Sequence, residues 1–139
     1  MLEKIALKLA MTLDGKIATR TGQSKWITGP LARQRVMRIR SEFQAILTGV
    51  NTVIADNPSL NVRDSDGNLQ SGSSPIRVVL DSHGRIPLHC NLLNDSLVHQ
   101  TIVMGGSGFD TEKKTKIQAN GAKFVEIPLI AGRVSLPDA

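Results

Sequence analysis

Short apolar segments alternate along this chain with segments of helical periodicity, and this order restricts the possible folds more than any other feature of the sequence. Strands are predicted at residues 3–10, 44–49, 75–81, 101–106 and 123–129. Helices are predicted at residues 29–43, 50–56 and 110–121. Because strands that alternate with helices are typical of parallel sheets, we expect an α/β fold with a mostly parallel sheet and helices on both faces.

The two longer predicted helices carry clear helix signals. In the segment 29–43, Pro30 suits a first helical turn. Apolar side chains repeat there at the spacing of a core-facing stripe, at Ala32, Val36, Ile39 and Phe43. In the segment 110–121, Asp110 is expected to cap the helix. The polar stretch 64–75 has no periodicity and is predicted to be a loop.

Composition excludes several classes of protein. The chain has 139 residues and no apolar run near the ~20 residues of a membrane span. Its start lacks the pattern of a signal peptide, so we expect a cytoplasmic protein. The single cysteine, Cys90, excludes an internal disulfide framework and a zinc site made of several cysteines. The spacing of the histidines suggests no metal site.

The positive charge points to an anionic ligand. A net charge of +5 suits a nucleic acid or a phosphorylated small molecule. With three Phe, one Trp and no Tyr, the chain offers little aromatic surface for stacking bases. We therefore expect a phosphorylated small molecule, and neither a nucleic acid nor a membrane, as the partner.

Residues that bind a ligand are expected after the strands. Ligands of α/β sheets bind beyond the carboxyl ends of the strands, which points to the polar segments 11–29, 49–63 and 81–85. Thr52 stands at a helix start, where free N–H groups favour phosphate. Asp56 precedes an Asn-Pro pair, and the local pattern by itself favours a simple helix stop there.

Four stretches of the sequence resemble a known family. They are LKLAMTLDGKIA, GQSKWIT, AILTGVNTVIADNPSLNVR and PIRVVLDS. In order and spacing, from about residue 4 to 85, they resemble the reductase domain of bacterial riboflavin biosynthesis, which is usually the C-terminal half of a bifunctional deaminase-reductase. The resemblance implies a dihydrofolate-reductase-like fold. From residue 86 onward only the pattern of strands and helices matches.

The resemblance also implies an activity: the NADPH-dependent reduction of 5-amino-6-(5-phosphoribosylamino)uracil, whose ribosyl group becomes a ribityl chain. The positions that match contacts of the cofactor are Ala10, Trp26, Thr52, Asp56 and Ser82. The positions that match contacts of the substrate are Ser24, Arg40, Leu60 and Arg63. Lys8 and Asp56 match residues proposed to act in the chemistry.

Physical chemistry supports the binding roles of three of these side chains. Trp26, the one tryptophan, offers a flat apolar wall to a cofactor ring. The alternative is an indole packed against the core. The guanidinium groups of Arg40 and Arg63 match phosphate oxygens in pairs. The alternative for Arg40 is a solvated helix face.

The proposed chemistry requires a proton as well as a hydride. Lys8, on the first predicted strand, is a candidate to deliver the proton or to polarise the acceptor, with Asp56 orienting the lysine or relaying a proton. The alternative for Lys8 is a strand residue that faces solvent. Ser82 and the nearby Arg85 are expected to meet the 2′-phosphate of the cofactor, and the alternative for Arg85 is a simple turn.

We expect a single reductase domain over residues 1–139, incomplete at its C-terminal end, with no deaminase domain. The last residues, 135–139, carry the signals of a helix start, and the family's downstream glutamate and Gly-Gly segment have no counterpart here. An unpaired sheet edge favours pairing with another chain, so a homo-oligomer is expected. Two alternatives stay open. One is a non-catalytic fragment that oligomerises or binds nucleotides weakly, and the other is a dihydrofolate-reductase-like enzyme of another substrate.

Overall fold

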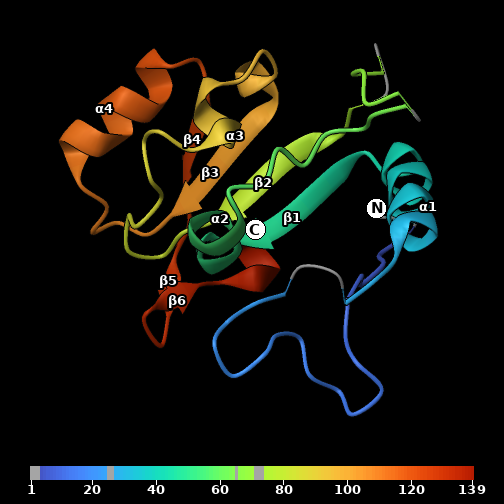
Figure 1. Cartoon of the computed structure of the whole chain (residues 1–139). Helices are drawn as coiled ribbons and strands as arrows, with labels where there is room; N and C mark the ends of the chain where they lie inside the picture. Colours follow the sequence, from blue (N-terminus) through green and yellow to red (C-terminus); the bar gives the residue numbers. More distant parts are fainter. Residues whose placement is uncertain (1–3, 25–26, 65, 71–73) are drawn as a thin grey trace.

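A four-stranded parallel sheet forms the centre of the molecule (Figure 1). The computed structural model describes residues 4–24, 27–64, 66–70 and 74–139. The strands are β1 (Ala45–Gly49), β2 (Ile76–Leu80), β3 (Thr101–Gly105) and β4 (Lys123–Glu126). They lie side by side in that order, and each neighbouring pair is parallel. The sheet confirms the predicted α/β fold.

Helices connect the strands, as parallel pairing requires. The connecting helices are α2 (Val50–Asp56), α3 (Asn91–Asn94) and α4 (Thr111–Ala119). Helix α1 (Pro30–Ser41) precedes β1, and the short 3₁₀ turns are η1 (Val98–Gln100) and η2 (Leu136–Asp138). An antiparallel pair, β5 (Leu129–Ile130) and β6 (Arg133–Val134), follows the sheet. Asp110 caps α4 as predicted, because its side chain accepts a hydrogen bond from the backbone N–H of Lys113. Within the described ranges, no helix has the length and apolar character needed to cross a membrane.

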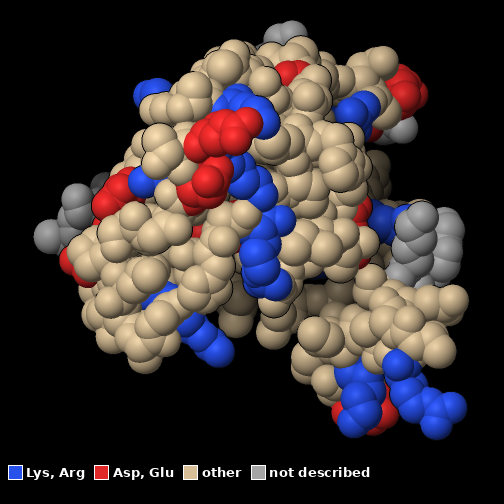
Figure 2. All heavy atoms as spheres, turned by 90° about the vertical axis from the view of Figure 1, so that its left-hand side faces the viewer, with Lys and Arg blue, Asp and Glu red and all other residues tan. Residues whose placement is uncertain are grey.

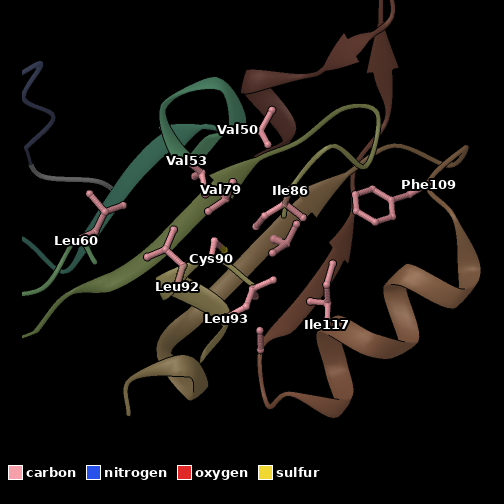
Figure 3. Close-up of a cluster of buried hydrophobic side chains, with 12 residues drawn as sticks. Val50, Val53, Leu60, Val79, Ile86, Cys90, Leu92, Leu93, Phe109 and Ile117 are labelled. Carbon is pink, nitrogen blue, oxygen red and sulfur yellow. The ribbon is translucent and has the colours of Figure 1, made fainter. Parts of the chain in front are cut away.

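The core lies where β2 and β3 meet the helices. Consecutive residues of β2, Arg77, Val78 and Val79, are all buried, so this strand is covered on both of its faces. Figure 3 shows apolar side chains from α2, β2, α3 and α4 directed toward a common centre. The most buried of them include Val79, Ile86, Leu92, Leu93, Val103 and Ile117. Full burial of each such side chain is worth about 1.5–3 kcal/mol.

The strand predicted at residues 3–10 is wrong for the described part, 4–10, which forms no strand. Its alternating side chains are exposed instead, with Ile5 and Leu7 each 83% accessible. Alternation creates an apolar row, but a strand also needs a neighbour to pair with. Near the start of this segment, Lys4 lies 3.6 Å from Glu42 and over the ring of Phe43.

Candidate functional site

Two of the predicted substrate residues, Arg40 and Arg63, meet at one asparagine. Arg40 Nη1 donates to the backbone oxygen of Asn61 across 3.0 Å. Arg63 Nε donates to the side-chain oxygen of the same residue across 3.2 Å, and its Nη1 donates to the Gly67 oxygen. Asn61 is only 4% exposed. A buried asparagine therefore fixes two guanidinium groups that are far apart in the sequence.

Arg40 is not a solvated residue of a helix face. It is half-buried near the end of α1, whereas Arg35 and Arg38 of the same helix are exposed. Burial lowers the pKa of Arg40, because desolvation penalises its charged form. A partly desolvated guanidinium whose other donors stay available suits an anionic group, which would restore the lost solvation.

Leu60, the third predicted substrate residue, lies between these arginines in sequence but points elsewhere. It is 8% exposed and belongs to the apolar core. Its backbone has a positive φ of 48°, an unusual conformation for leucine. Leu60 therefore anchors the segment that carries Arg63, and its side chain is directed into the protein.

A second polar group lies at the carboxyl ends of β1 and β2, which are adjacent through the Gly49–Leu80 pair. Asp81 is fully buried, and its carboxylate accepts from the backbone N–H groups of Arg85 and Ile86 at 2.9 and 2.8 Å. This carboxylate therefore shapes the turn that carries Ser82 and Arg85.

The turn after β2 contacts α2 and β6. Arg85 Nη2 donates to the side-chain oxygen of Asn51 at 2.6 Å, in the first turn of α2. Thr52, the next residue, is exposed beside it. The hydroxyl of Ser82 accepts from the backbone N–H of Val134 at 2.9 Å. Thr52, Ser82 and Arg85 thus come from two strand ends to one edge of the sheet, where the sequence predicts a cofactor phosphate.

The predicted residues of the N-terminal region are not brought to either group. Lys8 and Ser24 are exposed and Ala10 is half-buried, in chain that forms no strand or helix. Among the described residues, Lys8 makes no hydrogen bond or ion pair, so no Lys8–Asp56 contact forms. Asp56 is exposed as the last residue of α2. Trp26 lies outside the described residues.

A shallow hollow of 490 Å³ lies beside Arg85, against α4. Its lining carries both signs of charge, with Arg85, Lys113 and Lys116 beside Asp110 and Glu112. Figure 2 shows one face of the molecule, on which lysine and arginine lie close to aspartate and glutamate. Lys113 donates to the Gly84 oxygen, and Lys116 pairs with Glu112 at 2.6 Å, which raises the pKa of Lys116. Because the carboxylates of Asp110 and Glu112 also line it, the hollow is a weaker anion site than the two groups above.

Sequence reasoning missed the residues that hold the site together. Asn61 carries no local signal, and its role depends on two arginines 21 and 2 residues away. Arg77 carries a signal, because it is a charged residue in a strand expected to be buried on both faces. It is fully buried, and its guanidinium binds Asp95 at 2.6 and 2.9 Å.

The described part of the chain holds no group of three or more His, Cys, Asp or Glu residues suited to a metal ion. Cys90 is 1% exposed, and burial raises the pKa of its thiol. This cysteine is therefore part of the core.

The chain is similar to proteins of riboflavin biosynthesis in both sequence and structure. A family model described as the RibD C-terminal domain matches residues 3–139. The riboflavin biosynthesis protein RibD of Actinobacillus pleuropneumoniae is 40% identical over 134 residues, which cover 96% of this chain and 34% of that protein. A 2,5-diamino-6-ribosylamino-4(3H)-pyrimidinone 5′-phosphate reductase of Methanothermobacter thermautotrophicus is 38% identical, covering 94% of this chain and 61% of the relative.

Solved structures of similar proteins lead to the same relatives. Acinetobacter baumannii RibD, form 1, matches with a TM-score of 0.69 and 38% identity over 88% of this chain and 32% of that one. A pyrimidine reductase-like protein of Corynebacterium diphtheriae matches with a TM-score of 0.66 at 16% identity, covers 86% of this chain and 53% of that one, and shows the fold alone. These likenesses confirm the dihydrofolate-reductase-like fold. The chain spans about a third of the length of the RibD relatives cited here.

Proposed function

The chain belongs to the RibD C-terminal domain family, and from that premise we propose that residues 3–139 act as a reductase domain of riboflavin biosynthesis. The reaction is the NADPH-dependent reduction of the ribosyl group of 5-amino-6-(5-phosphoribosylamino)uracil to the ribityl form. The archaeal relative is named for the reduction of a ribosylaminopyrimidinone 5′-phosphate, which is the same class of substrate.

The observation that carries this proposal is the convergence of Arg40 and Arg63 on Asn61. The substrate class has a phosphate at one end of its sugar, and two guanidinium groups held by one buried residue provide a fixed pair of cations for it. Nη2 of either arginine donates none of the hydrogen bonds identified among the described residues. Charge-assisted bonds from these atoms to phosphate would be stronger than bonds between neutral groups.

For the cofactor, we assign the edge of the sheet formed by Thr52, Ser82 and Arg85. The donors gathered there, two hydroxyls and a guanidinium, fit the phosphate groups of a dinucleotide, and the exposed Arg85 favours NADPH over NADH through the extra 2′-phosphate. Ala10, Trp26 and Asp56 complete the proposed contacts by their match to family positions. When bound, the nicotinamide supplies the hydride for the reduction.

The remaining proposed roles concern the proton and the substrate. Lys8 is proposed to donate a proton at the acceptor atom, with Asp56 orienting it. Ser24 and Leu60 are proposed substrate contacts, Leu60 through its backbone because its side chain is buried. For Lys8 and Ser24 the support is the family match alone, since both lie exposed.

We also propose that the chain assembles as a homo-oligomer in the cytoplasm. Exposed apolar side chains at Ile5, Leu7 and Leu13 support self-association, because apolar surface of this kind is normally covered. Among the described residues, β1 pairs only with β2, and no described strand covers its other edge.

The test of the proposed reaction is a coupled measurement on the 139-residue chain. The chain is mixed with NADPH and 5-amino-6-(5-phosphoribosylamino)uracil, and cofactor oxidation and pyrimidine mass are followed together. We expect NADPH loss that depends on the pyrimidine and a product heavier by two hydrogen atoms. A folded chain that oxidises no NADPH and binds no phosphorylated pyrimidine would contradict the proposal.

A further inference from the structure

The segment 57–63, which carries Arg63 away from α2, depends on tertiary contacts for its path. It forms no helix or strand, and its one bridge joins Arg63 to Leu69. Asn57 and Leu60 both have positive φ, 42° and 48°. Such backbone is unfavourable for leucine and persists only where the surroundings enforce it.

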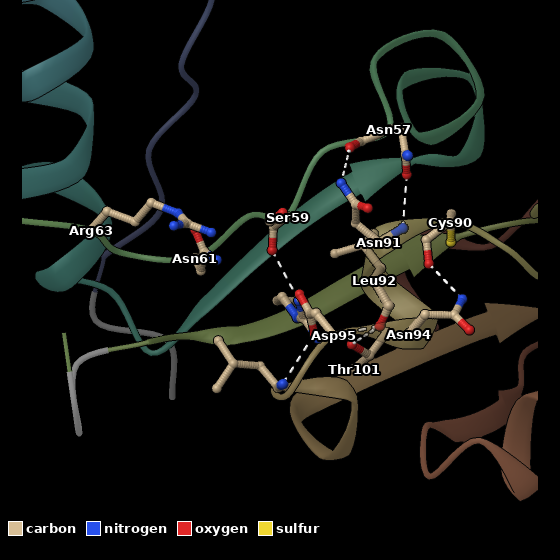
Figure 4. Close-up of polar contacts among 12 residues, drawn as sticks. Asn57, Ser59, Asn61, Arg63, Cys90, Asn91, Leu92, Asn94, Asp95 and Thr101 are labelled. Carbon is tan, nitrogen blue, oxygen red and sulfur yellow. Dashed lines mark hydrogen bonds and ion pairs between the residues drawn. The ribbon is translucent and has the colours of Figure 1, made fainter. Parts of the chain in front are cut away.

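Asn91 holds the start of this segment by a reciprocal pair of hydrogen bonds (Figure 4). Its backbone N–H donates to the side-chain oxygen of Asn57 at 2.8 Å, and its side-chain Nδ2 donates to the backbone oxygen of Asn57 at 2.8 Å. Asn57 is the C-cap residue of α2 and has a left-handed backbone conformation, in which it makes both bonds. Asn91 therefore fixes the direction in which the chain leaves α2.

Two further contacts hold the segment at alternate residues. Nη1 of the buried Arg77 donates to the backbone oxygen of Ser59 at 3.0 Å. Arg40 holds the backbone oxygen of Asn61, and the side chain of Asn61 orients Arg63. The chain is thus fixed at residues 57, 59 and 61 before it reaches the side chain that we assign to the substrate phosphate.

The side chains of the two asparagines of α3 have different hydrogen-bond partners. Asn94 Nδ2 donates to the backbone oxygens of Leu88 and Cys90, each at 2.8 Å, and so stabilises its own turn. Within the described residues, the side chain of Asn91 bonds to Asn57 alone. Because α3 has its own stabilising asparagine, the contact of Asn91 with the distant segment is available for another role.

We propose that Asn91 is a positioning residue of the substrate site. Acting through Asn57, it sets the path of residues 57–63, and that path places Arg63 beside Arg40 for the substrate phosphate. This inference rests on the proposed function. It adds a specific mechanical role for α3, an element that contacts neither proposed ligand.

The experiment compares Asn91→Ala with Asn94→Ala, which removes an exposed asparagine from the same helix. The affinities of the full chain for 5-amino-6-(5-phosphoribitylamino)uracil and for NADPH are measured by calorimetry, with thermal unfolding recorded for each variant. Loss of the hydrogen bond from Asn91 Nδ2 to the Asn57 oxygen predicts about three- to tenfold weaker pyrimidine binding for Asn91→Ala. NADPH affinity is expected to stay within about twofold, because the missing bond affects only the segment 57–63, which carries Arg63 of the proposed pyrimidine site. Asn94→Ala is expected to lose stability while both affinities are retained.

A second pair keeps the inference testable if Asn91→Ala folds poorly. Asn57→Asp retains the acceptor for Asn91 and tolerates positive φ, so it should bind the pyrimidine like the parent chain. Asn57→Ala loses the acceptor and is strained, so it should bind about tenfold more weakly.

Equal pyrimidine affinity in the parent chain, Asn91→Ala and Asn57→Ala would overturn the positioning role while the proposed function stands. Equal losses in Asn91→Ala and Asn94→Ala would also overturn it, because the effect would then come from general destabilisation. A parent chain that binds neither ligand contradicts the proposed function itself, and the positioning role fails with it.

Discussion

Arg40 in α1 donates a hydrogen bond of 3.0 Å to the backbone oxygen of Asn61, 21 residues further along the chain. This contact joins helix α1, which precedes the sheet, to the segment that follows α2. Arg63 binds the side chain of the same asparagine. The proposed phosphate site therefore depends on a tertiary contact, and each of its parts can be tested separately.

Removing Arg40 is expected to weaken binding of the phosphorylated pyrimidine. Loss of a charge-assisted bond costs about 1.5–3 kcal/mol, which is roughly 10- to 100-fold in affinity. Calorimetric titration of Arg40→Ala with the ribityl product measures this. Arg38→Ala is the matched control, since it removes the same charge from an exposed position of the same helix. If both variants bind equally well, Arg40 does not contact the phosphate.

Removing Arg85 is expected to reduce the preference for NADPH over NADH. Its guanidinium lies at the sheet edge with one donor on Asn51, and the account gives it the 2′-phosphate that only NADPH carries. NADPH affinity should fall by about tenfold or more in Arg85→Ala, while NADH affinity changes little. Arg35→Ala, again an exposed arginine, controls for net charge. An equal loss of affinity for NADPH and for NADH would show that Arg85 does not contact the 2′-phosphate.

Breaking the pair of the fully buried Arg77 with the partly buried Asp95 is expected to destabilise the fold. Asp95→Asn leaves the fully buried guanidinium without its counter-charge, and loss of one partner of such a pair costs about 3 kcal/mol or more. Urea unfolding measures the free energy. Lys114→Ala removes a more exposed pair with Glu126 and should cost less than about 1 kcal/mol. Comparable losses in the two variants would show that Asp95 is not a critical counter-ion.

Gly105 at the end of β3 is required for packing. A Cβ at this position would lie 2.5 Å from Cδ2 of Phe109, whose ring meets Phe124 edge-on. Gly105→Ala should therefore lower the free energy of unfolding by about 1–3 kcal/mol. Gly108→Ala, where a Cβ would meet nothing within 4 Å, is the control. A stable Gly105→Ala variant would show that the Phe109 ring moves aside at little cost.

The local sequence pattern was sufficient to predict the positions of three of the four strands of the parallel sheet. The predicted strands at 44–49, 75–81 and 101–106 match β1, β2 and β3 within about a residue at each end, because each is an apolar run bounded by glycine or polar residues. The helix predicted at 29–43 ends at Ser41, and the apolar run predicted at 123–129 divides between β4 and β5. Local sequence leaves such boundaries weakly defined.

The sequence-based predictions that were wrong, and the residues that were not predicted at all, depend on partners far away in the sequence. The first predicted strand has the correct alternation, yet no described strand pairs with it. The resemblance to a family identified Arg40 and Arg63 individually, but no local pattern shows that one buried asparagine joins them. Asn91 was missed for the same reason, since its partner Asn57 lies 34 residues away. Arg77 could have been singled out as a charged residue in a buried strand, but its partner Asp95, 18 residues away, could not.

The most direct test of the central claim is a two-ligand titration of the folded chain. NADPH is titrated first, and the ribityl pyrimidine phosphate is then titrated into the NADPH-saturated protein, with heat measured in both steps. We expect one saturable site for each ligand, and pyrimidine binding that is about 10- to 100-fold weaker in Arg40→Ala but unchanged in Arg38→Ala. A folded chain that releases no heat with either ligand, or that binds the pyrimidine equally well in both variants, would contradict it.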